Sequence, residues 1–266
     1  MKVRLPMLLM ALLVLGASLT LTLSRYGYSF QDRDAIQAAS SPLHWSGTDE
    51  LGRDRTVRVA AALLIGLTGA SLAGAITTLI AAAFGLLAAF SNRAIAALLI
   101  FVSDVFLSLP WLFLLMMARS LMPLTASPLE TVVATFLVLA LLGWPACARA
   151  VYSGALNLRN AEWMIQGHAC GLRKRQLLRM HLLPHLRPLL LPQFLICLPA
   201  FLIAEANLGA LGLGIGEPLP SWGAMLMEMD NSAMLMSSHW VYLPIILLVI
   251  VLLILESIST QVEPHA

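Results

Sequence analysis

The sequence predicts an all-α, polytopic membrane protein with six transmembrane helices, and two observations carry this prediction. First, 59% of the 266 residues are hydrophobic and only 11% are charged, whereas a soluble domain is roughly half apolar and about a quarter charged. Second, six separate apolar runs approach or exceed the ~20 residues that a helix needs to cross a membrane. This composition excludes a soluble enzyme and a nucleic-acid-binding module.

The six runs follow one another along the whole chain. They are Leu5–Leu23, Val59–Phe90, Ala94–Ala118, Leu129–Ala148, Leu189–Ala206 and Val241–Ile258. The first run continues through Leu19 and Leu21, beyond the candidate cleavage site Gly16-Ala17-Ser18. We therefore expect it to remain as a membrane anchor rather than to be removed as a signal peptide.

The second run is expected to form one extended or tilted helix. Two spans and a turn would need roughly 40 residues, and no proline, asparagine or charged residue interrupts Val59–Phe90. Gly66, Ala70 and Gly74 recur at intervals of four. Small side chains therefore share one face of this helix, and another helix is expected to pack closely there.

Polar groups in the third and fifth runs, or directly after the fifth, are candidates for a solute pathway: Asp104, Ser108, Glu205 and Asn207. Charge inside a bilayer is costly, so such groups usually face a water-filled path, a partner or a neighbouring helix. Pro110 follows Asp104 and Ser108, which predicts a bent helix with a polar face. A structural hydrogen bond between helices explains Asp104 equally well.

The distribution of basic residues predicts the orientation of the chain. The segment between the fourth and fifth runs carries a single acid, Glu162, among the basic residues Arg149, Arg159, Arg173, Lys174, Arg175, Arg179 and Arg187. Cytoplasmic loops of membrane proteins carry such an excess, and with six spans both termini would then be cytoplasmic too. Residues 1–56 would form an anchor helix and an extracytoplasmic loop, and residues 57–266 a transmembrane domain with a cytoplasmic loop at about 152–187.

The cytoplasmic loop has the pattern of two short helices divided by a glycine. Gly171 separates the stretches Ala161–Cys170 and Leu172–Leu183, each of which has helical periodicity. A helix–glycine–helix element below a membrane bundle suits docking into a groove of another protein. A basic loop that only sets the topology is the alternative.

The chain lacks the motifs of an enzyme. It has no phosphate-binding P-loop, no zinc-binding H-E-x-x-H helix and no G-x-S-x-G nucleophile turn. His181 and His185 lie four residues apart, but no third metal ligand is evident. We therefore expect a non-catalytic chain that holds no metal and no cofactor.

Two further segments are expected at the extracytoplasmic face. Gly47–Asp54 reads GTDELGRD and precedes the second helix. Thr48 is predicted to cap that helix, with Asp49 and Glu50 in its first turn, where negative charge is favourable. Trp222, beside prolines, is typical of a short element at the membrane interface.

Together these segments resemble the permease subunits of binding-protein-dependent ABC importers, in particular the C-type permeases of the peptide and nickel branch. Gly171 followed by Leu183-Pro184 matches part of their cytoplasmic loop, although the E-A-A position reads Ile165-Gln166-Gly167 and His181 replaces an isoleucine. Their other motifs are matched by Gly47–Asp54, Glu162-Trp163, Glu205-Ala206-Asn207, Leu211-Gly212-Leu213-Gly214 and Pro220-Ser221-Trp222-Gly223.

The resemblance implies a subunit of the bacterial inner membrane that forms half of a pathway for peptides or nickel chelates. Implied partners are a B-type permease, one or two P-loop ATPases that use ATP and Mg²⁺, an extracytoplasmic solute-binding protein and membrane lipids, with no nucleic acid. An ion-coupled secondary transporter that uses Asp104 and Glu205 is the alternative.

The resemblance also assigns roles to two groups of residues. The residues that would couple the chain to the ATPase are Glu162, Gln166, Gly167, Ala169, Gly171, Leu172, Leu183 and Pro184. The residues that would form an extracytoplasmic gate or contact the binding protein are Thr48, Asp49, Gly52, Arg53, Asp54, Trp222 and Gly223.

Overall fold

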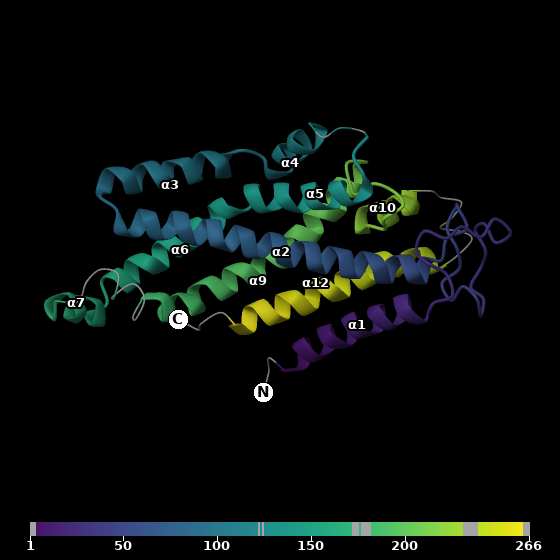
Figure 1. Cartoon of the computed structure of the whole chain (residues 1–266), viewed down its shortest axis with the longest axis horizontal. Helices are drawn as coiled ribbons and strands as arrows, with labels where there is room; N and C mark the ends of the chain where they lie inside the picture. The colour runs from purple at the N-terminus through teal and green to yellow at the C-terminus, as the bar shows by residue number, and fades with distance from the viewer. Residues whose placement is uncertain are drawn as a thin grey trace.

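The computed structural model is an elongated bundle of helices (Figure 1). It describes residues 4–121, 123, 125–171, 176, 182–230 and 239–262. Five helices in these ranges are long and apolar enough to cross a membrane, and a bent helix pair brings the number to six. The predicted all-α, polytopic fold class is confirmed.

Helix α2 (Arg55–Phe90) is a single helix of 36 residues, as the uninterrupted run predicted. It forms the centre of the bundle, because it packs against four other helices: α1 (Arg4–Leu23), α5 (Pro128–Leu142), α6 (Trp144–Arg159) and α9 (Leu183–Ala210). A Cβ atom at Gly66 would meet Trp222 and Leu202, and one at Gly74 would meet Leu198 of α9. The small face of α2 therefore admits another helix, as expected.

The third predicted span is not one helix but two. Helix α3 (Arg93–Ser108) and helix α4 (Trp111–Ser120) are bent by 83° at the break between them. Pro110 stands at this break as the N-cap of α4, and the residue before it, Leu109, is extended. Proline lacks an N–H group and disfavours helical conformation in its predecessor, so the bend predicted from Pro110 becomes a full interruption.

The fourth span is longer than its apolar run. Helix α5 (Pro128–Leu142) starts with a capping box between Ser127 and Glu130, and α6 (Trp144–Arg159) continues it well beyond Ala148. The last turn of α6 is polar but anchored, because Arg159 donates a hydrogen bond of 2.7 Å to the carbonyl oxygen of Ala89 in α2. Composition alone does not reveal such a tertiary anchor.

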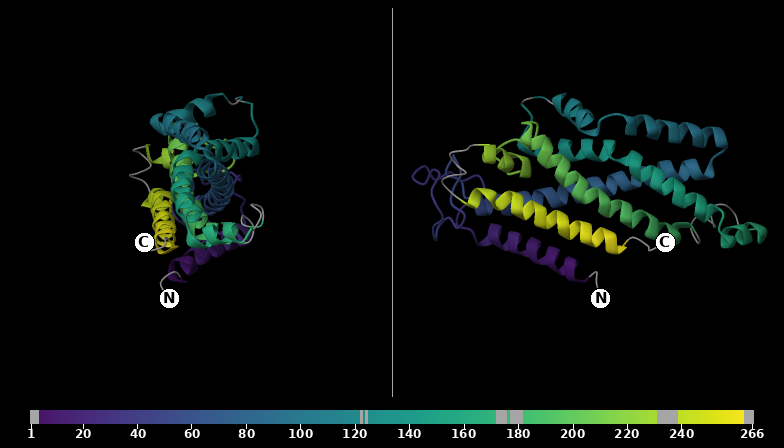
Figure 2. Two further views of the ribbon diagram at one scale, coloured as in Figure 1. Left: turned by 90° about the vertical axis from the view of Figure 1, so that its left-hand side faces the viewer. Right: turned by 180° about the vertical axis from the view of Figure 1, so that it is seen from behind.

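The remaining elements complete the two ends of the bundle. Helix α7 (Glu162–Ala169) follows α6 at one end, and α9 (Leu183–Ala210) returns along the bundle with Pro188, Pro192 and Pro199 inside it. The other end carries the loop of residues 24–54, α10 (Trp222–Met227) and the short helices η2 (Glu228–Asp230) and η3 (His239–Tyr242). Helix α12 (Leu243–Val262) lies beside α1 in both views of Figure 2. We call the end of the bundle that carries α7 the α7 end, and the end that carries the loop of residues 24–54 the loop end.

Candidate functional site

At the loop end, residues 47–54 form a tight turn just before α2. Thr48 and Asp54 pair as an isolated antiparallel bridge, and Gly47 and Gly52 have φ values of 71° and 75°. Such angles favour glycine. A Cβ atom at Gly52 would also overlap the carbonyl oxygen of Asp32, so both the dihedral angle and the space at this position require glycine.

The cap of α2 is Asp54 rather than Thr48. The Asp54 carboxylate accepts a hydrogen bond of 3.2 Å from the N–H of Val57 in the first turn. The Thr48 side chain instead donates to the carbonyl oxygen of Ala35 and accepts from the N–H of Ala38 at 2.8 Å. The predicted N-cap was wrong because the turn at residues 47–54 carries the chain further before α2 begins.

Asp49 organises a buried cluster of charges inside this turn. Its carboxylate accepts hydrogen bonds from the Arg53 N–H at 2.9 Å and the Arg53 Nε at 2.6 Å, and lies 3.6 Å from the Arg58 Nε. The side chains of Asp49, Arg53 and Arg58 are exposed by 2%, 8% and 1%. Both arginines also pair with Glu217, which belongs to the loop between α9 and α10. This loop is therefore held to the start of α2 by charge.

Burial by itself lowers the pKa of Arg53, but hydrogen bonds to Asp49 and Glu217 outweigh that effect and raise it above the ordinary value. A second ion pair joins Arg55 Nε to Glu228 at 3.4 Å. Burial raises the pKa of the Glu228 carboxyl, against the opposing effect of Arg55. The cluster thus ties α2 to both the loop before α10 and η2 after it.

Sequence reasoning found Asp49, Arg53 and Asp54 but missed Glu217 and Glu228, the distant partners of Arg53, Arg58 and Arg55. Glu217 and Glu228 lie more than 150 residues further along the chain. The local signal was Arg55 and Arg58, two charged residues in the first turn of an otherwise apolar helix. Charge at such a position implies a nearby counter-charge.

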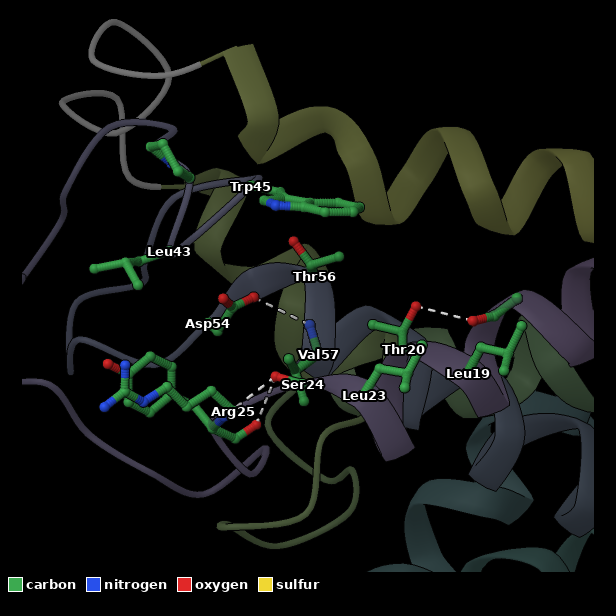
Figure 3. Close-up of a pocket in the computed structure, with 13 residues that line it drawn as sticks. Leu19, Thr20, Leu23, Ser24, Arg25, Leu43, Trp45, Asp54, Thr56 and Val57 are labelled. Carbon is green, nitrogen blue, oxygen red and sulfur yellow. Dashed lines mark hydrogen bonds between the residues drawn. The ribbon is translucent and has the colours of Figure 1, made fainter.

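A cavity of about 480 Å³ lies between α1, the loop of residues 24–54 and the start of α2 (Figure 3). Leu19, Thr20 and Leu23 of α1 line one side of it, while Leu43 and Trp45 come from the loop. Trp45 is 73% exposed. An exposed tryptophan at the end of a membrane helix is typical of the membrane–water interface.

Trp222 does not have the exposed interfacial position that its sequence context suggested. It is fully buried at the start of α10, which Ser221 caps. Its indole occupies the space left by the missing side chain of Gly66, and a Cβ atom at Gly223 would overlap Gly209 of α9. The glycines therefore let α10 pack directly against α2 and α9.

The four pathway candidates lie in two separate places. Glu205 is 1% exposed and lies next to Ser221, Trp222 and Gly223 at the start of α10. Asn207, also on α9, is exposed. Asp104 and Ser108 lie on the exposed side of α3, where Asp104 accepts a hydrogen bond of 2.6 Å from Arg149 of α6.

At the α7 end, the coupling candidates that the structure describes lie on α7, directly after it or at the start of α9. Glu162 and Gln166 are exposed on this helix, Gly167 and Ala169 lie within it, and Leu183 and Pro184 begin α9. Gly171, with φ 75° and open space where a Cβ atom would stand, ends the α7 turn, as a glycine past a helix C-terminus usually does. Leu172 and most of the predicted second short helix lie outside the described residues.

Comparison with known proteins places the chain in a family. Residues 81–264 match the model of the family described as "Binding-protein-dependent transport system inner membrane component". The chain is 32% identical over 197 residues to the dipeptide transport system permease protein DppC of Bacillus subtilis, covering 74% of this chain and 59% of that protein. It is 28% identical to the oligopeptide transport system permease protein OppC of B. subtilis, covering 82% of this chain and 70% of that protein.

A solved structure shares the fold. A chain of the inward-facing MetNI methionine ABC transporter superposes with a TM-score of 0.58 at 16% identity, covering 77% of this chain and 94% of that chain. The family match extends over more than half of the sequence and confirms the resemblance inferred from the motifs. The chain therefore belongs to the family of multi-pass inner-membrane components of binding-protein-dependent transport systems.

Proposed function

We propose that this chain is the permease half of an ATP-driven importer and carries peptides or similarly sized solutes across the inner membrane. In this proposal the α7 end and both termini are cytoplasmic, and the loop end faces the binding protein. The chain itself holds no cofactor, because ATP and Mg²⁺ act on separate ATPase subunits. The observation that carries the proposal is the way in which α7 is attached to the bundle.

Helix α7 projects beyond the ends of α6 and α9 (Figure 1), yet it is not loosely attached. Met164 is 5% exposed and packs with Leu182 and Leu186 in a small core separate from the main one. The rings of Trp163 and His185 stack with centroids 4.5 Å apart. A force on α7 would therefore be transmitted to the start of α9, and from there along the membrane bundle.

The opposite face of α7 is open for a partner. Glu162, Ile165 and Gln166 are exposed, and Ile165 by 61%. Positions i, i+3 and i+4 share one helix face, so an apolar side chain stands there between two polar ones. This pattern suits a helix that lies in the groove of another protein, which we take to be the ATPase subunit.

The test is the purification of the tagged chain with its ATPase from mild detergent. Ile165→Asp removes an apolar contact worth about 2 kcal/mol when buried, so the ATPase should bind about 30-fold more weakly. Asn160→Asp is the matched control, because it adds the same charge at an exposed position at the end of α6. Equal retention of the ATPase by both variants would refute the docking role of α7.

The loop end supplies the second half of the proposal. The charge cluster of Asp49, Arg53, Arg58 and Glu217 holds the loop before α10 against the start of α2 there. We propose that the binding protein docks on the exposed part of this end, which includes the half-exposed Glu217 side chain. The other half of the pathway would come from a second, B-type permease in a heterodimer. Peptides are the favoured solutes because the relatives are named as dipeptide and oligopeptide permeases, and nickel chelates are a second class.

The ion-coupled alternative finds less support. It needs Asp104 and Glu205 to act together, but Asp104 pairs with Arg149 on α6 while Glu205 is buried beside α10. An ion-coupled carrier would lose activity with an ionophore and keep it after ATP depletion. The ATP-driven importer should keep its activity with an ionophore and lose it after ATP depletion.

A further inference from the structure

Helix α6 presents an exposed surface unlike that of the other long helices. The exposed large apolar side chains include Leu72 and Leu79 on α2, Leu137 on α5 and Leu253 on α12. Helix α6, which the structure describes completely, exposes none. Its exposed residues are Ala146, Arg149, Ser153, Asn157 and the terminal Arg159.

The first four of these residues lie on one side of α6, because they follow each other at intervals of three and four. Asp104 of α3 joins them through its ion pair with Arg149, and Ser108 lies one helical turn further along α3. We call Asp104, Ser108, Arg149, Ser153 and Asn157 the polar stripe. The side chains of Arg149 and Asp104 are 52% and 45% exposed, so the pair forms on an open surface and not inside the chain.

The ion pair lies deep in the membrane-spanning part of the bundle. The hydrogen bond from Arg159 to Ala89 places the ends of α6 and α2 at one level. At 1.5 Å per residue, Arg149 stands about 15 Å from the end of α6, and Asp104 about 16 Å from the start of α3. With the polar residues Ser91-Asn92-Arg93 between α2 and α3 taken as the membrane edge, both helices place the pair near the middle of a hydrocarbon core of about 30 Å.

A half-exposed ion pair at that depth is unfavourable against lipid tails, and charged groups there face water or protein. We propose that the polar stripe lines a water-filled path for the solute, on the side of this chain that faces the second permease. This inference rests on the proposed function and assigns the pathway to α3 and α6 rather than to Glu205. Polar hydroxyl, amide and paired charged groups suit a hydrated, zwitterionic solute.

The test uses single cysteines and a charged, membrane-impermeant thiosulfonate reagent on the complete transporter. Cys170→Ser removes the exposed native thiol, while Cys147 and Cys197 are buried and their reaction is measured as background. Ser153→Cys lies in the polar stripe and Ala146→Cys continues its side of α6, about 9 Å and 20 Å from the α7 end. We call these two the stripe variants. Leu79→Cys is the control, because Leu79 is 69% exposed and lies about 16 Å from that end.

We expect both stripe variants to react at least about tenfold faster than the Leu79→Cys control in at least one nucleotide state. The thiolate that attacks the reagent, forming a mixed disulfide and releasing sulfinate, forms only where water reaches the cysteine. Equally slow labelling in every nucleotide state, in a complex that retains its ATPase and transports, would overturn the inference. Cross-linking of the stripe cysteines to a neighbouring membrane protein without labelling would also overturn it. These outcomes can be told apart from a failure of the proposed function itself, because in that case no ATPase would co-purify with the chain.

Discussion

Asp49→Asn offers a sharp test of the charge cluster at the loop end. The substitution keeps the shape of the side chain but removes its charge. Either orientation of the new amide turns its NH₂ group towards donors: the Arg53 Nε on one side, or the N–H groups of Leu51 and Arg53 on the other. The variant therefore loses both an ion pair and a hydrogen-bond acceptor.

The size of the effect follows from burial. Unit charges 4 Å apart attract by about 4 kcal/mol at an effective dielectric constant of 20. Removing one partner of a buried pair typically costs about 3 kcal/mol or more, because the other charge stays buried. Glu217 still pairs with both Arg53 and Arg58 in the variant, so we take the lower value. The free energy needed to open the 47–54 turn should fall by about 3 kcal/mol. This corresponds to about 100-fold in the population of the open turn.

Amide hydrogen exchange measures this opening directly. The N–H groups of Gly52, Arg53 and Arg55 are bonded within the turn, to Asp49 and Gly47, so they should exchange about 100-fold faster in the variant. Amides in the middle of α9 should be unchanged. The control is Asp34→Asn, which removes the same charge from an exposed position in the same loop. An acceleration below about threefold, or an equal one in the control, would refute the assigned role of Asp49.

Three glycine substitutions test how α2 packs against α5 and α9, and how α10 packs against α9. A Cβ atom at Gly69 would overlap the Phe136 ring, whereas one at Gly74 would make ordinary contacts. Gly69→Ala should lower the free energy of unfolding by about 1–3 kcal/mol, while Gly74→Ala should raise it by up to about 1 kcal/mol through helix propensity. The melting temperature in detergent should therefore be highest for Gly74→Ala, intermediate for wild type and lowest for Gly69→Ala, and the reverse order would contradict the packing. A Cβ atom at Gly223 would overlap the backbone of Gly209, so Gly223→Ala should separate α10 from α9 at a cost of about 3 kcal/mol. A melting temperature equal to that of wild type would disprove this close approach.

The sequence by itself determined the architecture in the membrane. Apolar runs separated by polar segments fix where helices cross, because the bilayer leaves no other partner for backbone N–H and C=O groups. The single long α2, its small face and the bend at Pro110 followed from such local rules. The motifs likewise identified the family, since they needed only residue types at fixed spacing.

Tertiary structure decided which polar groups meet. Arg58 and Glu217, or Asp104 and Arg149, lie far apart in the chain, and one sequence holds no record of such pairs. Trp222 had the composition of an interfacial residue, yet the slot at Gly66 buries it. Arg149, which the sequence grouped with the basic residues of the cytoplasmic segment, lies inside α6 and within the candidate membrane span Pro128–Arg159. Local patterns set the helices, but the partner of each charge depends on the packing of helices distant in sequence, which local patterns do not encode.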